Sequence, residues 1–367
     1  MKKFVALFLA VAMLMSLCAI ASAETAKIGI SMPTQSLERW NRDGSYLDEQ
    51  FKAAGFETIL TYSDNDAGRQ VNDIQNMLAE DVDLLIIAAI DGEALNTVMN
   101  EAAEKGVPVI SYDRLILNDA VSYYVSFDNY TVGKLQGEYV EAALDLANAG
   151  GKTYNIEFTA GDPADNNAGY FFNGAFDVLK GYIEAGTLKV VSGQTEFQAV
   201  ATAQWNTDTA LNRATNVLAS FYADGTVLDA WVCSNDSTAL GVAKAIESDY
   251  AGENTIIVTG QDGDIANLAN IVDGKQTMTV YKNVKNEAVV TLALAQAMIA
   301  GEIDGEALAQ TFGVPCAFDT ESYETSAGVK CPSFLLVPSV ITVDNLNDLV
   351  ETGLYTMGAD GYLQAAN

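Results

Sequence analysis

The chain has 367 residues and carries 49 Asp and Glu against 19 Lys and Arg, a formal net charge of −30, with no histidine. The absence of an imidazole excludes nucleophilic catalysis that depends on a histidine base and metal sites that depend on histidine ligands. The acidic excess argues against nucleic-acid binding, because Lys and Arg must neutralise the phosphates. With 49% hydrophobic and 19% charged residues, the composition predicts a folded protein with a large core.

The N-terminal segment has the features of a secretory signal peptide. Lys2 and Lys3 precede an apolar run over 4–20, and residues 21–23 (ASA) form an A-x-A cleavage site. A membrane anchor is the alternative, but the run is short and no basic stop-transfer flank follows it. We therefore expect a signal peptide at 1–23 and a protein secreted across the cytoplasmic membrane, periplasmic or at the cell surface. A lipid anchor on Cys18 is disfavoured, because Leu17 stands where a small residue is needed.

Three further cysteines lie in the exported part of the chain. Cys316 and Cys331 bracket a polar, turn-rich segment, and export permits a disulfide between them. The sequence leaves a bridge and two free thiols open. Cys233 lies in an apolar run over 228–233 and is expected to be buried as a small hydrophobic residue.

We expect neither a metal site nor a cofactor. No two cysteines have the C-x2-C spacing of a zinc site. Asp64, Asn65 and Asp66 resemble part of a calcium loop, but the glycine at the sixth position and the glutamate at the twelfth are missing. We interpret this run as a solvated loop.

From residue 26 onward, short apolar runs alternate with segments of helical spacing. The first four runs, at 26–33, 57–63, 84–90 and 107–113, are predicted strands. Between them, Val71, Ile74 and Leu78 recur at i, i+3 and i+7 and predict a helix. Continuous rather than alternating apolar strands are typical of a parallel sheet that is buried on both faces.

The alternation restarts after Asn129 and forms a second unit. We predict helices at 131–147, from 167 onward and at 207–221, and strands at 153–161, 188–193, 228–236 and 255–262. Each unit has the size of a doubly wound α/β domain. The later segments, a strand at 277–282, a helix at 284–299 and an apolar strand at 333–342, are interpreted as pieces that cross back between the units.

Polar side chains follow several predicted strands, at the edge where open α/β sheets bind ligands. Each Asp among these residues has an alternative role as the cap of the next helix. If the two units face each other, however, these groups converge on one cleft. They are Asp91, Asp113, Arg114, Asn235, Asp236 and Asp262.

Charged donors and aromatic rings accompany these residues. Arg39, Arg114 and Lys282 supply charge-assisted hydrogen bonds, which also suit a neutral hydroxylated ligand. Trp40 and Trp205 supply flat apolar surfaces. Rings with polar groups between them match a sugar, although each Trp has the alternative of being core and Arg39 of being a solvated charge.

At these positions the chain resembles the periplasmic sugar-binding proteins of ABC transporters, in the subgroup of D-xylose-binding and multiple-sugar-binding proteins. Seven motifs occur in order along the exported chain. They are LERW at 37–40, YDRL at 112–115, SFDN at 126–129, GDPADNNA at 161–168, SND at 234–236, GQD at 260–262 and QTMTVYK at 276–282.

The resemblance implies an α/β fold of two doubly wound parallel-sheet lobes joined by a three-strand hinge, the type I arrangement. We expect one lobe to comprise 24–127 plus 283–333 and the other 128–282 plus 334–367. The implied partners are a monosaccharide and a membrane permease of the ABC type, with the protein itself a monomer. A second partner, a membrane sensor kinase or chemoreceptor, would make the protein a receptor, and the sequence leaves that alternative open.

The resemblance also implies that the site binds an aldopyranose, xylose being our first expectation and arabinose, glucose and galactose the alternatives. Two features depart from the pattern: the hairpin between Cys316 and Cys331, and Gln204 before Trp205, which bears on specificity. The candidate sugar-binding residues are Arg39, Trp40, Asp91, Asp113, Arg114, Asn166, Asn167, Trp205, Asn235, Asp262 and Lys282.

Two other function classes are weaker on the residues alone. A glycosidase needs one carboxyl group with a raised pKa, but Arg114 directly follows Asp113, and a cationic neighbour lowers a carboxyl pKa. A transcriptional repressor of the same fold needs an N-terminal DNA-binding helix pair and a basic surface, which the exported acidic chain lacks. We therefore expect a binding protein and not an enzyme.

Overall fold

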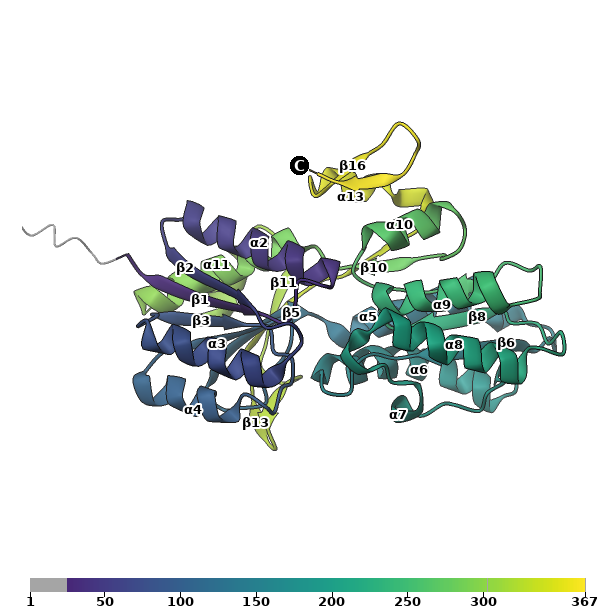
Figure 1. The fold of residues 1–367 in the computed structure, drawn as a ribbon, viewed down its shortest axis with the longest axis horizontal. Coiled ribbons are helices and arrows are strands. Elements are labelled where there is room, and N and C mark those ends of the chain that lie inside the picture. Colours follow the sequence, from purple (N-terminus) through teal and green to yellow (C-terminus); the bar gives the residue numbers. More distant parts are fainter. Residues whose placement is uncertain (1–24, 302, 367) are drawn as a thin grey trace, which may run out of the picture.

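The computed structural model describes residues 25–301 and 303–366. The signal peptide expected at 1–23 and the candidate lipid-anchor residue Cys18 lie outside these residues. Two α/β lobes lie end to end, and the chain passes between them near residues 128, 282 and 337 (Figure 1). The fold class expected from the sequence, two doubly wound parallel-sheet lobes joined by a hinge, is confirmed.

The first lobe is built on a seven-stranded sheet of order β11-β14-β5-β4-β3-β1-β2. Neighbouring strands are parallel except β11, which pairs antiparallel with β14 at one edge. The strands are β1 (Lys27–Met32), β2 (Glu57–Tyr62), β3 (Leu84–Ile87), β4 (Val109–Tyr112), β5 (Val121–Phe127), β11 (Cys316–Asp319) and β14 (Ser333–Leu336).

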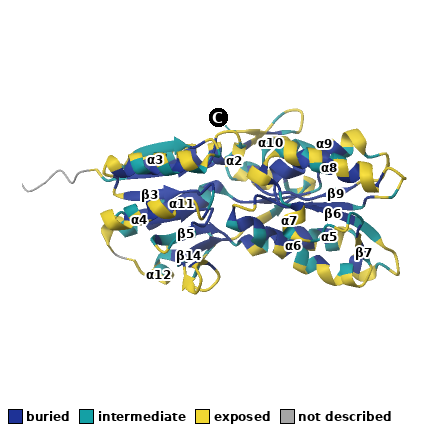
Figure 2. Ribbon diagram, turned by 60° about the horizontal axis from the view of Figure 1, so that its bottom comes forward, coloured by how far each residue is buried: buried dark blue, intermediate teal, exposed yellow. Residues whose placement is uncertain are grey.

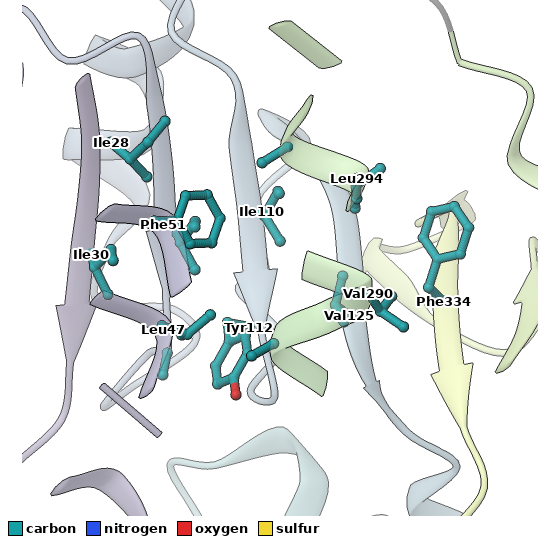
Figure 3. Packing of buried hydrophobic residues seen from close by; sticks show 14 of the residues in the cluster. Ile28, Ile30, Leu47, Phe51, Ile110, Tyr112, Val125, Val290, Leu294 and Phe334 are labelled. Atoms are coloured by element: carbon teal, nitrogen blue, oxygen red, sulfur yellow. The ribbon is translucent and has the colours of Figure 1, made fainter. Parts of the chain in front are cut away.

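Helices cover both faces of this sheet, as its mainly apolar inner strands require. Figure 3 shows Leu47 and Phe51 of α2 beside Ile30 of the sheet, and Val290 of α11 beside Val125. The opposite face is covered by α3 and α4. The helices of this lobe are α2 (Glu38–Ala53), α3 (Ala67–Ala79), α4 (Asn96–Lys105), α11 (Val284–Ala300) and the short α12 (Gly305–Ala309).

The second lobe has a smaller parallel sheet of order β7-β6-β8-β9, which a single bridge between Gln261 and Val280 connects to the pair β10-β15. Its strands are β6 (Tyr154–Thr159), β7 (Leu188–Val190), β8 (Ala230–Cys233), β9 (Ile257–Val258), β10 (Thr279–Tyr281) and β15 (Ser339–Ile341). One face packs against α5 (Asn129–Ala143) and α6 (Asn166–Glu184), and the other against α8 (Thr207–Phe221) and α9 (Asp236–Asp249).

The remaining elements lie around these two sheets. In Figure 2 the strands of both lobes are buried, and exposed residues gather on the outer sides of the helices and at the loops. These elements are α7 (Phe197–Val200), α10 (Ile265–Val272), α13 (Asn347–Glu351), the 3-10 turns Leu146–Asn148, Ala203–Trp205 and Val343–Asn345, the hairpin β12 (Glu324–Ser326) and β13 (Val329–Lys330), and the hairpin β16 (Tyr355–Met357) and β17 (Leu363–Ala365).

Two boundaries differ from those expected. The apolar run at 333–342 is two strands, because Val337 and Pro338 break it, and Pro cannot donate a ladder hydrogen bond. Its first half, β14, pairs with β5, so the expected lobe boundary at 333/334 falls inside a strand of the first lobe and the crossing lies after Leu336. The helix expected to reach residue 147 ends at Ala143, because Asp145 has φ 49°.

The structure also shows the surroundings of the three cysteines and of the acidic run at 64–66. Cys316, Cys331 and Cys233 are free thiols, and Cys233 is fully buried as expected. In the β11–β14 register Cys316 lies opposite Leu336, at the other end of the hairpin from Cys331. Asp66 caps α3 by accepting a hydrogen bond from the Arg69 amide. Over residues 25–301 and 303–366, no helix is long and apolar enough to span a bilayer.

Candidate functional site

A polar cleft lies where the carboxyl ends of the two sheets face each other. Its empty volume is about 420 Å³, part of which is open to solvent. Both lobes supply its walls. The lining residues are Leu37, Arg39, Trp40, Asp113, Arg114, Asp165, Phe171, Trp205, Asn235, Ser237, Gln261, Asp262, Asp264 and Lys282.

Eight of the eleven residues expected from the sequence therefore line one cleft. Asn167 lies behind the lining, where its side chain accepts a hydrogen bond from the Tyr124 hydroxyl at 2.9 Å and donates one to the Asp113 carbonyl oxygen. Asn166 is half-buried and does not line the cleft. One residue along a helix is a rotation of about 100°, so Asn166 and Asn167 do not share a face.

The expectation for Asp91 is wrong. Its carboxylate accepts hydrogen bonds from the amides of Glu93 and Ala94 at 2.8 and 3.1 Å, and it is not among the lining residues. These short-range contacts are the local capping role that an Asp after a strand commonly has. The strand-end rule predicted the right edge of the sheet but not which carboxylates point inward.

Arg39 is the centre of the polar network. This α2 residue is 4% exposed, and its guanidinium donates to Asp43 at 2.7 Å, to Asp113 and Asp262 at 2.9 Å, and to Glu287 at 3.0 Å. Burial alone would lower the pKa of Arg39, but the four carboxylates hold it well above its usual value. Asp262 belongs to the second lobe and the other three to the first, so this ion-pair network joins the lobes.

The surroundings of Asp113 lower its pKa, whereas a catalytic acid needs surroundings that raise its pKa. Its carboxylate accepts from Arg39 at 2.9 Å and from Lys282 at 2.8 Å. Burial would raise the pKa of Asp113, but the charges of Arg39 and Lys282 outweigh burial and hold it well below the ordinary range. An ionised Asp113 is a fixed hydrogen-bond acceptor and not a proton donor.

The apolar walls are aromatic. The guanidinium of Arg114 lies over the Trp40 ring at 4.7 Å from its centroid, and its Nε pairs with Asp165 at 3.0 Å. Trp205 donates from its indole nitrogen to the same carboxylate at 3.1 Å, which fixes the ring in the cleft. The ring packs directly over Gly161, where any Cβ atom would overlap it.

Sequence reasoning missed several residues of the site. Asp43 lies four residues after Arg39, so the i, i+4 spacing on one helix is a signal that would have found it. Asp165 precedes α6 and caps it, which is a recognisable N-cap position. Glu287 has no local signal, because it reaches Arg39 from α11, 248 residues away along the chain.

Chemically, the cleft combines three cations, four carboxyl groups and two indole rings, with donors and acceptors largely paired to each other. No group of three or more His, Cys, Asp or Glu side chains in the described part of the chain is arranged to bind a metal ion. Such a site suits a neutral ligand that has apolar faces and many hydroxyl groups, since each hydroxyl both donates and accepts.

Comparison with known proteins agrees with this geometry. The sequence profile described as a periplasmic binding protein domain matches residues 28–303. The multiple sugar-binding periplasmic receptor ChvE of Rhizobium radiobacter is 38% identical over 340 residues, 91% of this chain and 92% of its own. The D-xylose-binding periplasmic protein of Escherichia coli is 33% identical over 331 residues, 90% of this chain and 91% of its own.

Among solved structures, an ABC transporter solute-binding protein from Clostridium phytofermentans with bound β-D-glucose is similar, with a TM-score of 0.84 and 46% identity. The alignment covers 90% of this chain and 98% of that one. A carbohydrate transporter solute-binding protein from Chloroflexus aurantiacus in complex with D-glucose has a TM-score of 0.78 and 29% identity, over 90% of this chain and 98% of that one. The chain belongs to the periplasmic binding protein family.

Proposed function

We propose that the protein captures an aldopyranose sugar outside the cytoplasmic membrane and delivers it to an ABC-type permease. The observation that carries the proposal is the cleft itself, which is lined by paired cations and carboxylates from both lobes together with Trp40 and Trp205. The named ligands of the relatives are consistent with it, because they are xylose, glucose or several sugars. The 1–23 segment supports export.

Within the cleft, charged and amide side chains exchange hydrogen bonds with the sugar hydroxyls, and the two indoles cover the apolar faces of the sugar. These side chains are Arg39, Asp113, Arg114, Asn235, Asp262 and Lys282. Asn167 positions Asp113 through the carbonyl contact described above. We infer D-glucose and D-xylose as the first candidates, since the relatives name both. The two differ by one hydroxymethyl group, a difference that a pocket commonly discriminates by only about 1–3 kcal/mol.

The proposal makes the protein a binding protein and not an enzyme, because an ionised Asp113 between two cations is a poor general acid. It acts as a monomer, and the permease recognises its loaded form. A second candidate is a receptor role, in which the loaded protein also contacts a membrane sensor. The name of one relative, a sugar-binding receptor, favours this role.

A thermal-shift screen of the exported chain against glucose, xylose, arabinose, galactose and ribose tests the proposal. A ligand that binds only the folded state raises the unfolding temperature by mass action. We expect at least one aldopyranose to raise the unfolding temperature of wild type and of Asp91→Asn, because the Asp91 carboxylate only caps a turn. The same sugar at the same concentration should not raise the unfolding temperature of Asp113→Asn. No shift with any sugar, or an equal shift in both variants, would reject the cleft as a sugar site.

A further inference from the structure

Asp236 is a buried carboxylate directly behind the cleft. It is the first residue of α9 and is 0% exposed, whereas the preceding Asn235 is 8% exposed and lines the cleft. The strand-end rule did not distinguish these two neighbours. Asp236 does not line the cleft, so contact with a ligand does not explain why it is fully buried.

The Asp236 carboxylate binds the turn that presents Asp262. One oxygen accepts the amides of Gly263 and Asp264 at 3.0 and 2.9 Å. The other accepts the Gln276 side-chain amide at 2.9 Å and the Thr279 hydroxyl at 3.0 Å. The two oxygens therefore tie the turn after β9 to the segment that leads into β10.

This turn needs to be held, because its backbone is unfavourable. Asp262 has φ 107°, a conformation that favours glycine and costs of order 1–3 kcal/mol for other residues. Such a residue persists only where its surroundings fix it. In this conformation the Asp262 carboxylate lies 2.9 Å from Arg39 of the other lobe.

The space around Asp236 is also restricted. A Cβ atom on Gly260 would overlap both an oxygen of Asp236 and the side-chain nitrogen of Gln276. Gly260 has no positive φ, so its lack of a side chain is explained by this close approach and not by its backbone. The GQD sequence at 260–262 thus contains both the residue that faces the cleft and the glycine that makes room for its support.

We propose that Asp236 is a positioning residue, which sets sugar affinity by holding the 262–264 turn so that Asp262 faces Arg39 across the cleft. The inference rests on the proposed sugar-binding function and adds to it a residue that does not touch the ligand. It explains why two acidic residues, Asp236 and Asp262, are kept close together in one buried region.

Protonation gives this role a second signature. Burial and the charge of Asp262 raise the pKa of Asp236 to about 7. The other titratable groups that face it are Asp264 in the turn, which is itself paired with Arg42 of α2, and Cys233 at the end of β8. The ionised carboxylate accepts amide hydrogen bonds more strongly than the neutral acid but also repels Asp262, so affinity should change between about pH 6 and pH 8.

The test uses Asp236→Asn with Glu157→Gln as a matched control. Glu157 is also 0% exposed, lies in the same lobe, and accepts from the Ser192 amide and the Tyr222 hydroxyl, both at 2.9 Å, away from the cleft. We expect Asp236→Asn to weaken sugar binding about 10- to 100-fold and Glu157→Gln to leave it unchanged. The change of affinity with pH should be smaller in Asp236→Asn than in Glu157→Gln.

Hydrogen exchange of the amides of Gly263 and Asp264 tests positioning without a ligand. These two amides should exchange at least about 10-fold faster in Asp236→Asn than in Glu157→Gln. Gly260→Ala, which displaces the carboxylate without removing its charge, should reproduce the loss of affinity. If wild type binds a sugar and Asp236→Asn binds it equally, or if the two amides stay protected, the inference is wrong. If no sugar binds wild type, the proposed function fails first.

Discussion

Three residues of the cleft have backbone angles that L-amino acids seldom adopt. Asp113, Trp205 and Asp262 have φ angles of 55°, 53° and 107°. For Asp113 the surrounding contacts are visible, since its carbonyl oxygen accepts from the Tyr124 hydroxyl at 2.6 Å and the Ser126 hydroxyl at 3.0 Å. Strained backbone angles of this kind cluster at binding sites, where they direct side chains in ways that an ordinary turn does not. The local direction of the Asp113 side chain is therefore fixed by the residues around it.

Replacing Asp113 by Asn tests its role as a fixed acceptor. Asn tolerates positive φ and keeps the shape, but it removes the charge that Arg39 and Lys282 neutralise. We expect sugar binding to weaken by about 1–3 kcal/mol in calorimetry. Asp91→Asn, at another strand end, should bind as wild type does. Equal affinities of Asp113→Asn and wild type would contradict the proposed contact.

The raised pKa of Asp236 predicts an unusual dependence of stability on pH. The folded state keeps this proton up to about pH 7, whereas the unfolded chain releases it near pH 4. Between these values the folded state binds more protons, so its free energy of unfolding should fall as the pH rises.

Chemical unfolding at about pH 5.5 and pH 7.5 measures this slope in wild type and in Asp236→Asn. The variant lacks the group, so its slope should be shallower by up to about 1.4 kcal/mol per pH unit. Glu287, whose pKa burial also raises, does not face Asp236 and cancels in the comparison. The charge of Asp236 helps to raise the pKa of Asp264, so the pKa of Asp264 should fall in the variant and make its slope shallower still. Parallel slopes would show that Asp236 does not titrate in this range.

The fate of individual residues shows what sequence reasoning resolves. Asp113, Asn235 and Asp262 could be predicted because parallel strands bring their carboxyl ends to one edge. Asp91 meets the same rule, yet its side chain turns back to its own backbone. Side-chain direction after a strand depends on the loop conformation, which periodicity does not encode. Contacts from distant elements, such as Glu287 to Arg39, depend on the packing of the whole lobe.

Among the elements, predictions succeeded where the local signal was strong. The helix expected at 207–221 matches α8, which Asn206 caps. The run at 333–342 crosses between the lobes as expected, but it forms two strands and not one, because its two halves are equally apolar although they join different sheets. Continuous hydrophobicity indicates burial, but it does not say in which lobe. Within the run at 333–342, only Pro338 indicates where the chain passes from one lobe to the other.

The contact between α5 and α6 predicts opposite effects for two glycines of one helix. A Cβ atom on Gly174 would overlap the carbonyl oxygen of Tyr130 and crowd the amide nitrogen of Lys134 on α5, whereas nothing lies within 4 Å of a Cβ atom on Gly181. We expect Gly174→Ala to lower the free energy of unfolding by about 1–3 kcal/mol. Gly181→Ala should raise it by about 0.5–1 kcal/mol, because alanine favours a helix interior.

Urea unfolding of the two variants measures the difference. Asp165 caps α6 and Asn167 lies in its first turn, so a displaced helix should also weaken sugar binding in Gly174→Ala. Binding should be unchanged in Gly181→Ala. Equal stabilities would mean that α5 and α6 are not in close contact.

At the scale of the whole molecule, the two lobes meet through groups that also line the cleft. Arg39 of the first lobe pairs with Asp262 of the second, and Arg42 donates to the carbonyl oxygen of Asp262 at 3.1 Å. A ligand that contacts both lobes binds the closed arrangement better than an open one, and that difference shifts the population. The crossings near 128, 282 and 337 are few and short, which suits a hinge.

The most direct test of sugar capture between the lobes is small-angle scattering of the exported chain with and without saturating sugar. We predict that the radius of gyration falls on sugar addition while the far-ultraviolet circular dichroism stays constant. The double variant Asn235→Ala with Asp262→Ala, which lacks two contacts of the second lobe, should remain open at sugar concentrations that close wild type. Identical scattering curves for wild type with and without a sugar that calorimetry shows to be bound would contradict capture between the lobes.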